Sequence, residues 1–120
     1  MSRRDPAVLM KDMLDHAREA LEAAQGRSRG DLDTDRMLQV FLTHMVEIVG
    51  EAASRVPREE RERYAHLPWA EIVGIRNRLV HGYAYVDLDI LWNVVTRDLP
   101  PLIADLERIL AEQSGTGGQR

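Results

Sequence analysis

The sequence predicts an all-α protein, a small up-and-down bundle of four to five helices. Two observations carry this prediction. Apolar residues recur at steps of three or four through most of the 120 residues, and no segment alternates in the manner of a strand for more than a few residues. The length suits one domain. We expect a helical domain over residues 1–113 and a disordered, Gly-rich polar tail over residues 114–120.

The first two helices have clear boundaries. Asp5 is a good N-cap with Pro6 at the first helical position, and the apolar spacing continues to Gly26. A polar loop follows, after which Thr34 or Asp35 caps the helix with the broadest apolar stripe in the chain. This central core helix is expected to end before Pro57.

The sequence of the second half of the chain predicts a short charged segment followed by three further helices. Residues 57–64 are highly charged and form one or two helical turns or an ordered loop. The next helix starts near Pro68 and continues to residue 80, where Gly82 suits the left-handed residue that closes a helix. Asp87 caps another helix, and Pro100 and Pro101 break or sharply kink the chain before the last one.

Composition excludes several classes of protein. The net charge of −4 excludes a protein that binds nucleic acid by bulk positive charge alone. The absence of cysteine excludes disulfide scaffolds and thiolate sites. The longest uncharged stretch is ten residues, too short to cross a membrane. No two of the four histidines have zinc-ligand spacing, and no phosphate-binding glycine motif is present. We expect a cytoplasmic protein without a metal or cofactor, in which His44 is a core or interface residue.

The segment from Gly74 to Tyr83 gathers a guanidinium, a carboxamide, an imidazole and a phenol at the end of a helix. On a continuous helix Arg76 and His81 lie about 140° apart around the axis, so both could border one cleft. The spacing alone is weak evidence. Arg76 could equally pair with Glu51 or Glu71, and His81 could cap helix carbonyls.

A series of short motifs surrounds this segment. In order these are Gly50-Glu51-Ala52, Pro68-Trp69, Arg76-Asn77 with His81 and Tyr83, Val86-Asp87, Leu91-Trp92 and Leu99-Pro100. Their order and spacing resemble the HepT family of the HEPN superfamily. The resemblance covers roughly residues 5–112, essentially the whole of the predicted domain.

The resemblance implies a fold, an activity and a partner. The family fold is a helical bundle that forms homodimers, with a metal-independent endoribonuclease site at the dimer cleft. Arg76 and His81 would be the catalytic pair, with Asn77 as a supporting polar residue. HepT proteins resemble toxins of toxin–antitoxin pairs, and their partner is a small MntA-like nucleotidyltransferase. That antitoxin adds AMP groups to a tyrosine that corresponds to Tyr83.

The chemistry of RNA suits such a site. The 2′-hydroxyl beside each phosphate is the nucleophile, so cleavage needs proton transfer and charge stabilisation but no metal. An imidazole exchanges protons near neutral pH, and a guanidinium holds phosphoryl oxygens. We therefore hypothesise that His81 is the general base or acid and Arg76 the phosphate clamp.

Local charge is compatible with RNA. Residues 55–78 contain six arginines and four glutamates, whereas the rest of the chain is acidic. Candidate RNA contacts are Arg58, Arg61, Arg63 and Arg78, although a solvated helix face with i,i+4 ion pairs would have the same sequence pattern.

A second function stays open, in which the chain is a non-catalytic partner or nucleotide-binding module of the nucleotidyltransferase.

Overall fold

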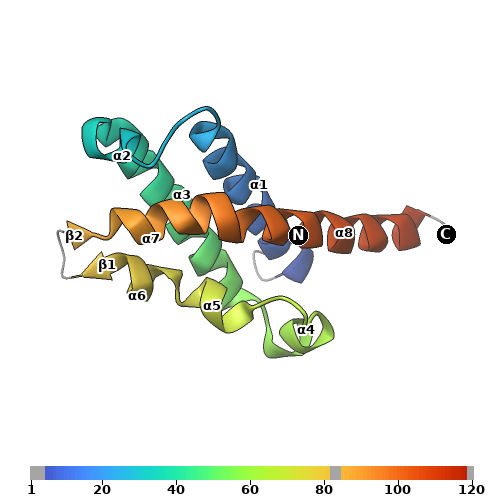
Figure 1. Cartoon of the computed structure of the whole chain (residues 1–120). Helices are drawn as coiled ribbons and strands as arrows, with labels where there is room; N and C mark the ends of the chain where they lie inside the picture. The colour runs from blue at the N-terminus through green and yellow to red at the C-terminus, as the bar shows by residue number, and fades with distance from the viewer. Residues whose placement is uncertain (1–4, 82–84, 119–120) are drawn as a thin grey trace.

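The computed structural model confirms the all-α fold and describes residues 5–81 and 85–118. Three long helices dominate it: α1 (Pro6–Ala24), α3 (Arg36–Arg55) and α8 (Leu99–Gly118). Helix α1 packs against both α3 and α8. Figure 1 shows that α8 lies in line with the segment before it and that α3 crosses behind this line. The molecule is elongated, with extents of 52 × 29 × 25 Å.

Short elements connect these helices. They are α2 (Asp31–Thr34), α4 (Arg58–Arg63), α5 (Trp69–Val73), α6 (Ile75–Leu79), β1 (Val80–His81), β2 (Tyr85–Val86), α7 (Leu88–Asn93) and the π-helical turn η1 (Val94–Asp98). The strands form a two-stranded antiparallel ribbon in which Val80 faces Val86 and His81 faces Tyr85. The sequence patterns do not predict this ribbon, which lies at the end of the molecule opposite the C-terminus (Figure 1).

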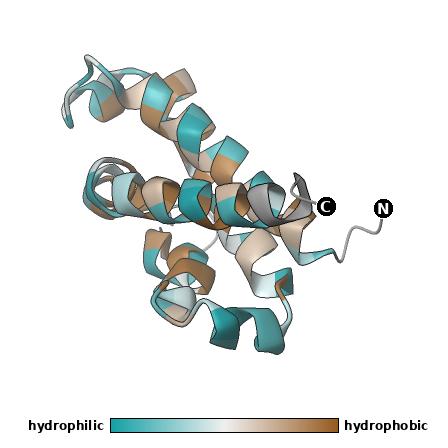
Figure 2. Ribbon diagram, turned by 90° about the vertical axis from the view of Figure 1, so that its right-hand side faces the viewer, coloured by the Kyte–Doolittle hydropathy of each residue, from teal (hydrophilic) through white to brown (hydrophobic). Residues whose placement is uncertain are grey.

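The core is formed where the apolar stripes of the long helices meet. Met10 and Met13 of α1, Leu42 and Val46 of α3, and Leu106 of α8 are fully buried. Figure 2 shows the alternation of hydrophobic and hydrophilic residues along the helices that this packing requires. No helix in the described ranges is long and apolar enough to cross a membrane.

The predicted N-caps are confirmed. The carboxylates of Asp5, Asp35 and Asp87 accept hydrogen bonds from the amides of Ala7, Leu38 and Ile90, at 2.9, 3.0 and 3.1 Å. Each carboxylate satisfies one of the backbone donors that a helix leaves unpaired in its first turn. These caps set where α1, α3 and α7 begin.

The predicted helix from Pro68 to residue 80 is two short helices. It breaks at Gly74, whose backbone (φ −83°, ψ 3°) leaves the helical region between α5 and α6. A Cβ at this position would lie 3.1 Å from the carbonyl oxygen of Ala70. The break lets α6 change direction and present its own polar residues.

The prolines at 100 and 101 do not end the helical path. The chain passes through the wider turn of η1 and continues into α8, so α7 and α8 lie in line in Figure 1. Prolines lack the amide of a regular helix and clash with the carbonyl four residues before them. The wider turn just before them has the Leu99 amide bonded to the carbonyl of Val94. Helix α8 continues to Gly118, into the segment 114–120 that the sequence predicts as a disordered tail. The boundary at residue 113 stays a prediction.

A network of charges holds the corner between α1 and α3. Arg27 Nη2 donates to Asp35 Oδ2 at 2.7 Å, and its Nε donates to Asp31 Oδ2 at 3.3 Å. The bond from Arg27, followed by the bond from the Leu38 amide, lowers the pKa of the Asp35 carboxyl. The amide of Ser28 and then Arg27 lower the pKa of Asp31. This corner places the start of α3.

Candidate functional site

Helix α6 presents three consecutive polar side chains. Arg76, Asn77 and Arg78 are exposed, whereas Ile75 and Leu79 on either side of them are buried against the core. The two apolar residues lie four apart and anchor one face of this five-residue helix. The polar triplet therefore forms a ridge on the surface of the molecule.

Arg76 faces an acidic residue of α3. Its Nε lies 3.7 Å from Glu47 Oε2, and the Glu47 side chain is half-buried while that of Arg76 is 74% exposed. Of the partners that the sequence suggested, Glu51 lies one turn further along α3 and holds Arg55 at 2.9 Å, and Glu71 faces a different pocket. Glu47 does not stand out in the sequence, because only the packing of α6 on α3 selects which turn of α3 Arg76 meets.

A surface groove of about 440 Å³ runs beside this ion pair. It is lined by side chains from α3 and by Val86 of β2, namely Arg36, Gln39, Val40, Thr43, His44, Glu47 and Val86. His44 is exposed here and is not a core residue, as the sequence suggested it could be. The groove thus offers a guanidinium, an imidazole, a carboxylate, an amide and a hydroxyl group along one face of α3.

The two partners of the predicted catalytic pair lie in different elements. Arg76 is in α6, and His81 follows in β1, after the helix has ended at Leu79. The helical angle of about 140° between them therefore does not apply. The amide of Asp87 donates to the carbonyl of Leu79 at 2.8 Å and closes the base of the ribbon. The His81 side chain and all of Tyr83 lie outside the part of the chain that the structure describes.

The arginines of α4 are not gathered at this site. Arg61 donates to the carbonyls of Val56 at 3.0 Å and of Ser54 at 2.9 Å, and so caps the end of α3. Arg58 and Arg63 are exposed beside Glu62 and Glu60. In Figure 1, α4 lies on the side of α5 that is away from α6.

Arg78 projects from the other flank of α6. Its Nη2 lies 3.8 Å from Asp98 Oδ2 at the end of η1. Among the described residues, no three histidine or acidic side chains are close enough together to hold a metal ion. The polar groups at the surface of α6 are the guanidiniums of Arg76 and Arg78, the amide of Asn77, and the carboxylates of Glu47 and Asp98 that face the two arginines.

Comparison with known proteins identifies the family. The family model described as "Ribonuclease HepT-like" matches residues 13–109. The chain belongs to the HepT-like family. The motifs that carry the resemblance, from Gly50 to Pro100, all lie within the matched range.

Several relatives match over nearly their full length. "Putative RNase MJ1380" of Methanocaldococcus jannaschii is 31% identical over 107 residues, covering 89% of this chain and 98% of its own. "Putative RNase TTE0752" of Caldanaerobacter subterraneus is 30% identical, covering 92% of this chain and 98% of its own. "Probable ribonuclease HepT" of Thermococcus cleftensis is 31% identical, covering 82% of this HepT-like chain and 94% of its own. No solved structure matches the chain.

Proposed function

We propose that this HepT-like chain is a metal-independent endoribonuclease whose site is formed by Arg76 and His81. The single observation that carries the proposal is the exposed Arg76 guanidinium, which faces Glu47 of the groove, within a chain of the HepT-like ribonuclease family. Arg76 binds the phosphoryl oxygens of RNA and stabilises their charge in the transition state.

The reaction is an internal transfer at phosphorus. A general base removes the proton of the 2′-hydroxyl, and this oxygen attacks the adjacent phosphorus. The bond to the 5′-oxygen breaks, and a general acid protonates that oxygen. His81 takes one of these two proton-transfer roles. The products are a 2′,3′-cyclic phosphate and a 5′-hydroxyl, and Asn77 supports the bound phosphate beside Arg76.

The test is RNA cleavage by the purified chain in the presence of a metal chelator. We expect Arg76→Ala and His81→Ala to reduce the rate on the order of 10²–10³-fold. Arg108→Ala, which removes an exposed arginine of α8, is the matched control and should cleave normally. Unchanged cleavage by either site variant contradicts the assignment. Growth arrest by the chain that persists with His81→Ala favours the non-catalytic partner function instead.

The active form we propose is a homodimer. Three large apolar side chains are exposed on one face of α3: Met37, Val40 and Phe41, at 83%, 49% and 37%. Helical spacing brings them into line with His44 of the groove. A second copy of the chain that covers this apolar face would bring two grooves together and enclose Arg76 between them.

We propose that the chain is the toxin of a toxin–antitoxin pair, with an MntA-like nucleotidyltransferase as antitoxin. Transfer of AMP to the Tyr83 hydroxyl, with release of pyrophosphate from ATP, would add a phosphodiester anion two residues after His81. This anion would compete with RNA for the cationic site. Mass spectrometry after co-expression with the neighbouring transferase tests this, and a Tyr83 peptide without added AMP contradicts it.

A further inference from the structure

A second cavity lies on the flank of α6 away from Glu47. It has a volume of about 160 Å³ and opens between α5–α6 and the η1–α8 segment. Its floor is apolar and buried, formed by Ile72 and Ile75 on one side and by Leu99 and Leu102 on the other. This volume is below the range of about 300–1,000 Å³ that drug-sized ligands need. It suits one flat ring system.

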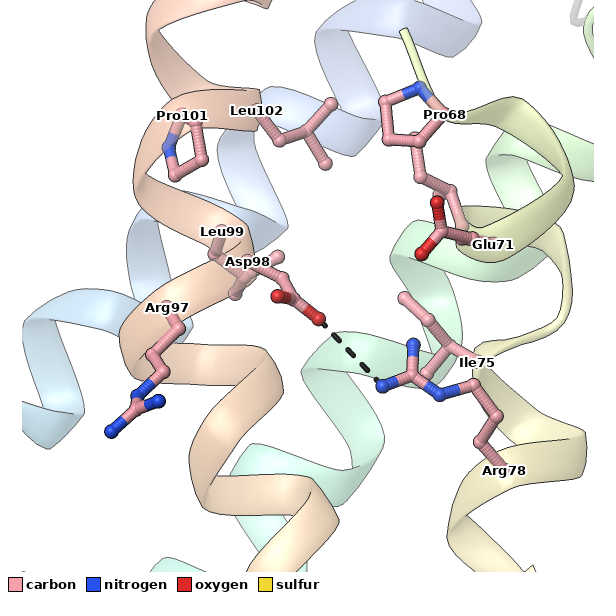
Figure 3. A pocket seen from close by; sticks show the side chains of 10 residues that line it. Pro68, Glu71, Ile75, Arg78, Arg97, Asp98, Leu99, Pro101 and Leu102 are labelled. Carbon is pink, nitrogen blue, oxygen red and sulfur yellow. Dashed lines mark ion pairs between the residues drawn. The ribbon is translucent and has the colours of Figure 1, made fainter.

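The rim of this pocket is polar. Figure 3 shows the carboxylates of Glu71 and Asp98 turned toward the space between the helices, whereas Arg97 points away. Arg78 closes one side of the mouth, with 3.8 Å between its Nη2 and Asp98 Oδ2. That distance is too long for a hydrogen bond, and both side chains are about half exposed. The pair can therefore separate to admit a ligand at little cost.

An apolar slot with carboxylate acceptors at its edge fits a nucleobase. Bases of single-stranded RNA leave their stack and insert between apolar or planar groups of a protein, and their edges are read by hydrogen bonds. Carboxylates accept from base amino groups. Guanine presents two adjacent donors, N1–H and the 2-amino group, to a single carboxylate. A guanidinium at the mouth suits the phosphate attached to such a base.

The position of the pocket relates it to the phosphate site. Arg76 and Arg78 are two residues apart in α6 and diverge by about 200° around its axis, so they lie on opposite flanks of the same ridge. A helix with its side chains is about 10 Å across. An RNA strand that crosses this ridge therefore covers it with about two to three nucleotides, at about 3.4 Å per stacked nucleotide.

We propose that this pocket holds a base of the RNA strand that flanks the phosphate bound by Arg76, with guanine as the best-matched base. The proposal rests on the proposed ribonuclease function. Glu71 and Asp98 accept from the Watson–Crick edge of the base, and Arg78 moves from Asp98 to the adjoining phosphate. The site therefore gives this enzyme a sequence preference near its cut, in addition to the phosphate contact.

The experiment measures equilibrium binding of short 2′-O-methyl RNAs to the full chain. These RNAs lack the nucleophile, so binding is measured whether or not the chain cleaves. We expect tighter binding when guanine replaces cytosine at one position, by about tenfold. The double variant Glu71→Gln, Asp98→Asn should lose this preference, even if the freed Arg78 binds every RNA more tightly. Asp105→Asn with Glu112→Gln, outside the pocket on α8, is the matched control and should keep the preference.

Three outcomes overturn the proposal: no guanine preference in the unchanged chain, a preference that survives in the double variant, or GMP alone binding as tightly as the RNA. The last outcome assigns the pocket to a free nucleotide. A chain that shows the preference but cleaves no natural RNA supports the pocket and contradicts the ribonuclease function. The two proposals are thus tested separately.

Discussion

Glu47 is the residue whose position most directly affects the proposed chemistry. Its carboxylate is half-buried and lies 3.7 Å from Arg76, so it attracts the guanidinium toward this side of α6. We expect Glu47→Gln to lower the cleavage rate about 3–10-fold without weakening RNA binding, because the Glu47 carboxylate orients Arg76 and also competes with phosphate for it. Single-turnover cleavage at saturating RNA measures this.

Two variants sharpen the test of Glu47. Glu51→Gln is the control, because Glu51 is on the same helix but pairs with Arg55. Glu47→Asp keeps the carboxylate and should recover part of the rate. An equal loss in the Glu51 variant would show that the acidic face of α3, and not the pair with Arg76, matters.

Gly50 is the residue that permits the close approach of α3 to α5. A Cβ there would lie 3.1 Å from the carbonyl oxygen of Ile72 and 3.9 Å from the Cβ of Ile75. We expect Gly50→Val to destabilise the fold by about 2 kcal/mol, because the added atoms force the helices apart. The urea midpoint measures this. Gly30→Ala is the control, since the nearest atom to its Cβ is 3.9 Å away, and it should unfold like the original chain.

At the scale of elements, the start of α3 depends on the carboxylates bound by Arg27. Because the pKa values of Asp31 and Asp35 in the folded chain lie below their ordinary value of 3.8, folding favours the ionised forms. This stabilisation is present above about pH 4 and is lost as the pH falls through the folded pKa values. The effect is modest because these side chains are substantially exposed.

We therefore expect Arg27→Gln to lower the urea midpoint at pH 6, and we expect the difference from the original chain to shrink below about pH 4. Urea titrations at several pH values measure this. Arg108→Gln, which removes an exposed arginine paired with Asp105 on α8, is the matched control. A difference that stays constant down to pH 2 would contradict a role for the ionised carboxylates.

At the scale of the whole molecule, the exposed apolar face of α3 predicts a dimer. We expect Phe41→Glu to produce a monomer in light scattering and to lose cleavage activity, because a charge cannot be buried in the interface. Ala104→Glu, at an exposed position of α8, is the control and should remain dimeric. If the Phe41 variant stays dimeric, the second copy binds elsewhere.

The helical class, the three N-caps and the long helices could be predicted from the sequence, because they depend on local spacing and on hydrogen bonds within one turn. The motif also singled out Arg76 as a candidate site residue, a role that stays a prediction. The partner of Arg76 could not be predicted, because Glu47 is 29 residues away along the chain and only the packing of α6 on α3 brings the two together. The roles of His81 and Tyr83 stay predictions.

By itself the sequence determined an all-α chain of the HepT-like family and placed the candidate residue Arg76 near the end of a helix. Only the tertiary structure decided the break at Gly74, the ribbon after α6, the π turn before the prolines and the different contacts that the arginines make. Arg61 caps α3, Arg76 faces Glu47 and Arg78 faces Asp98. The physical reason is that a charged side chain acquires its role from whatever the packing brings within a few ångströms, and local sequence does not contain that information.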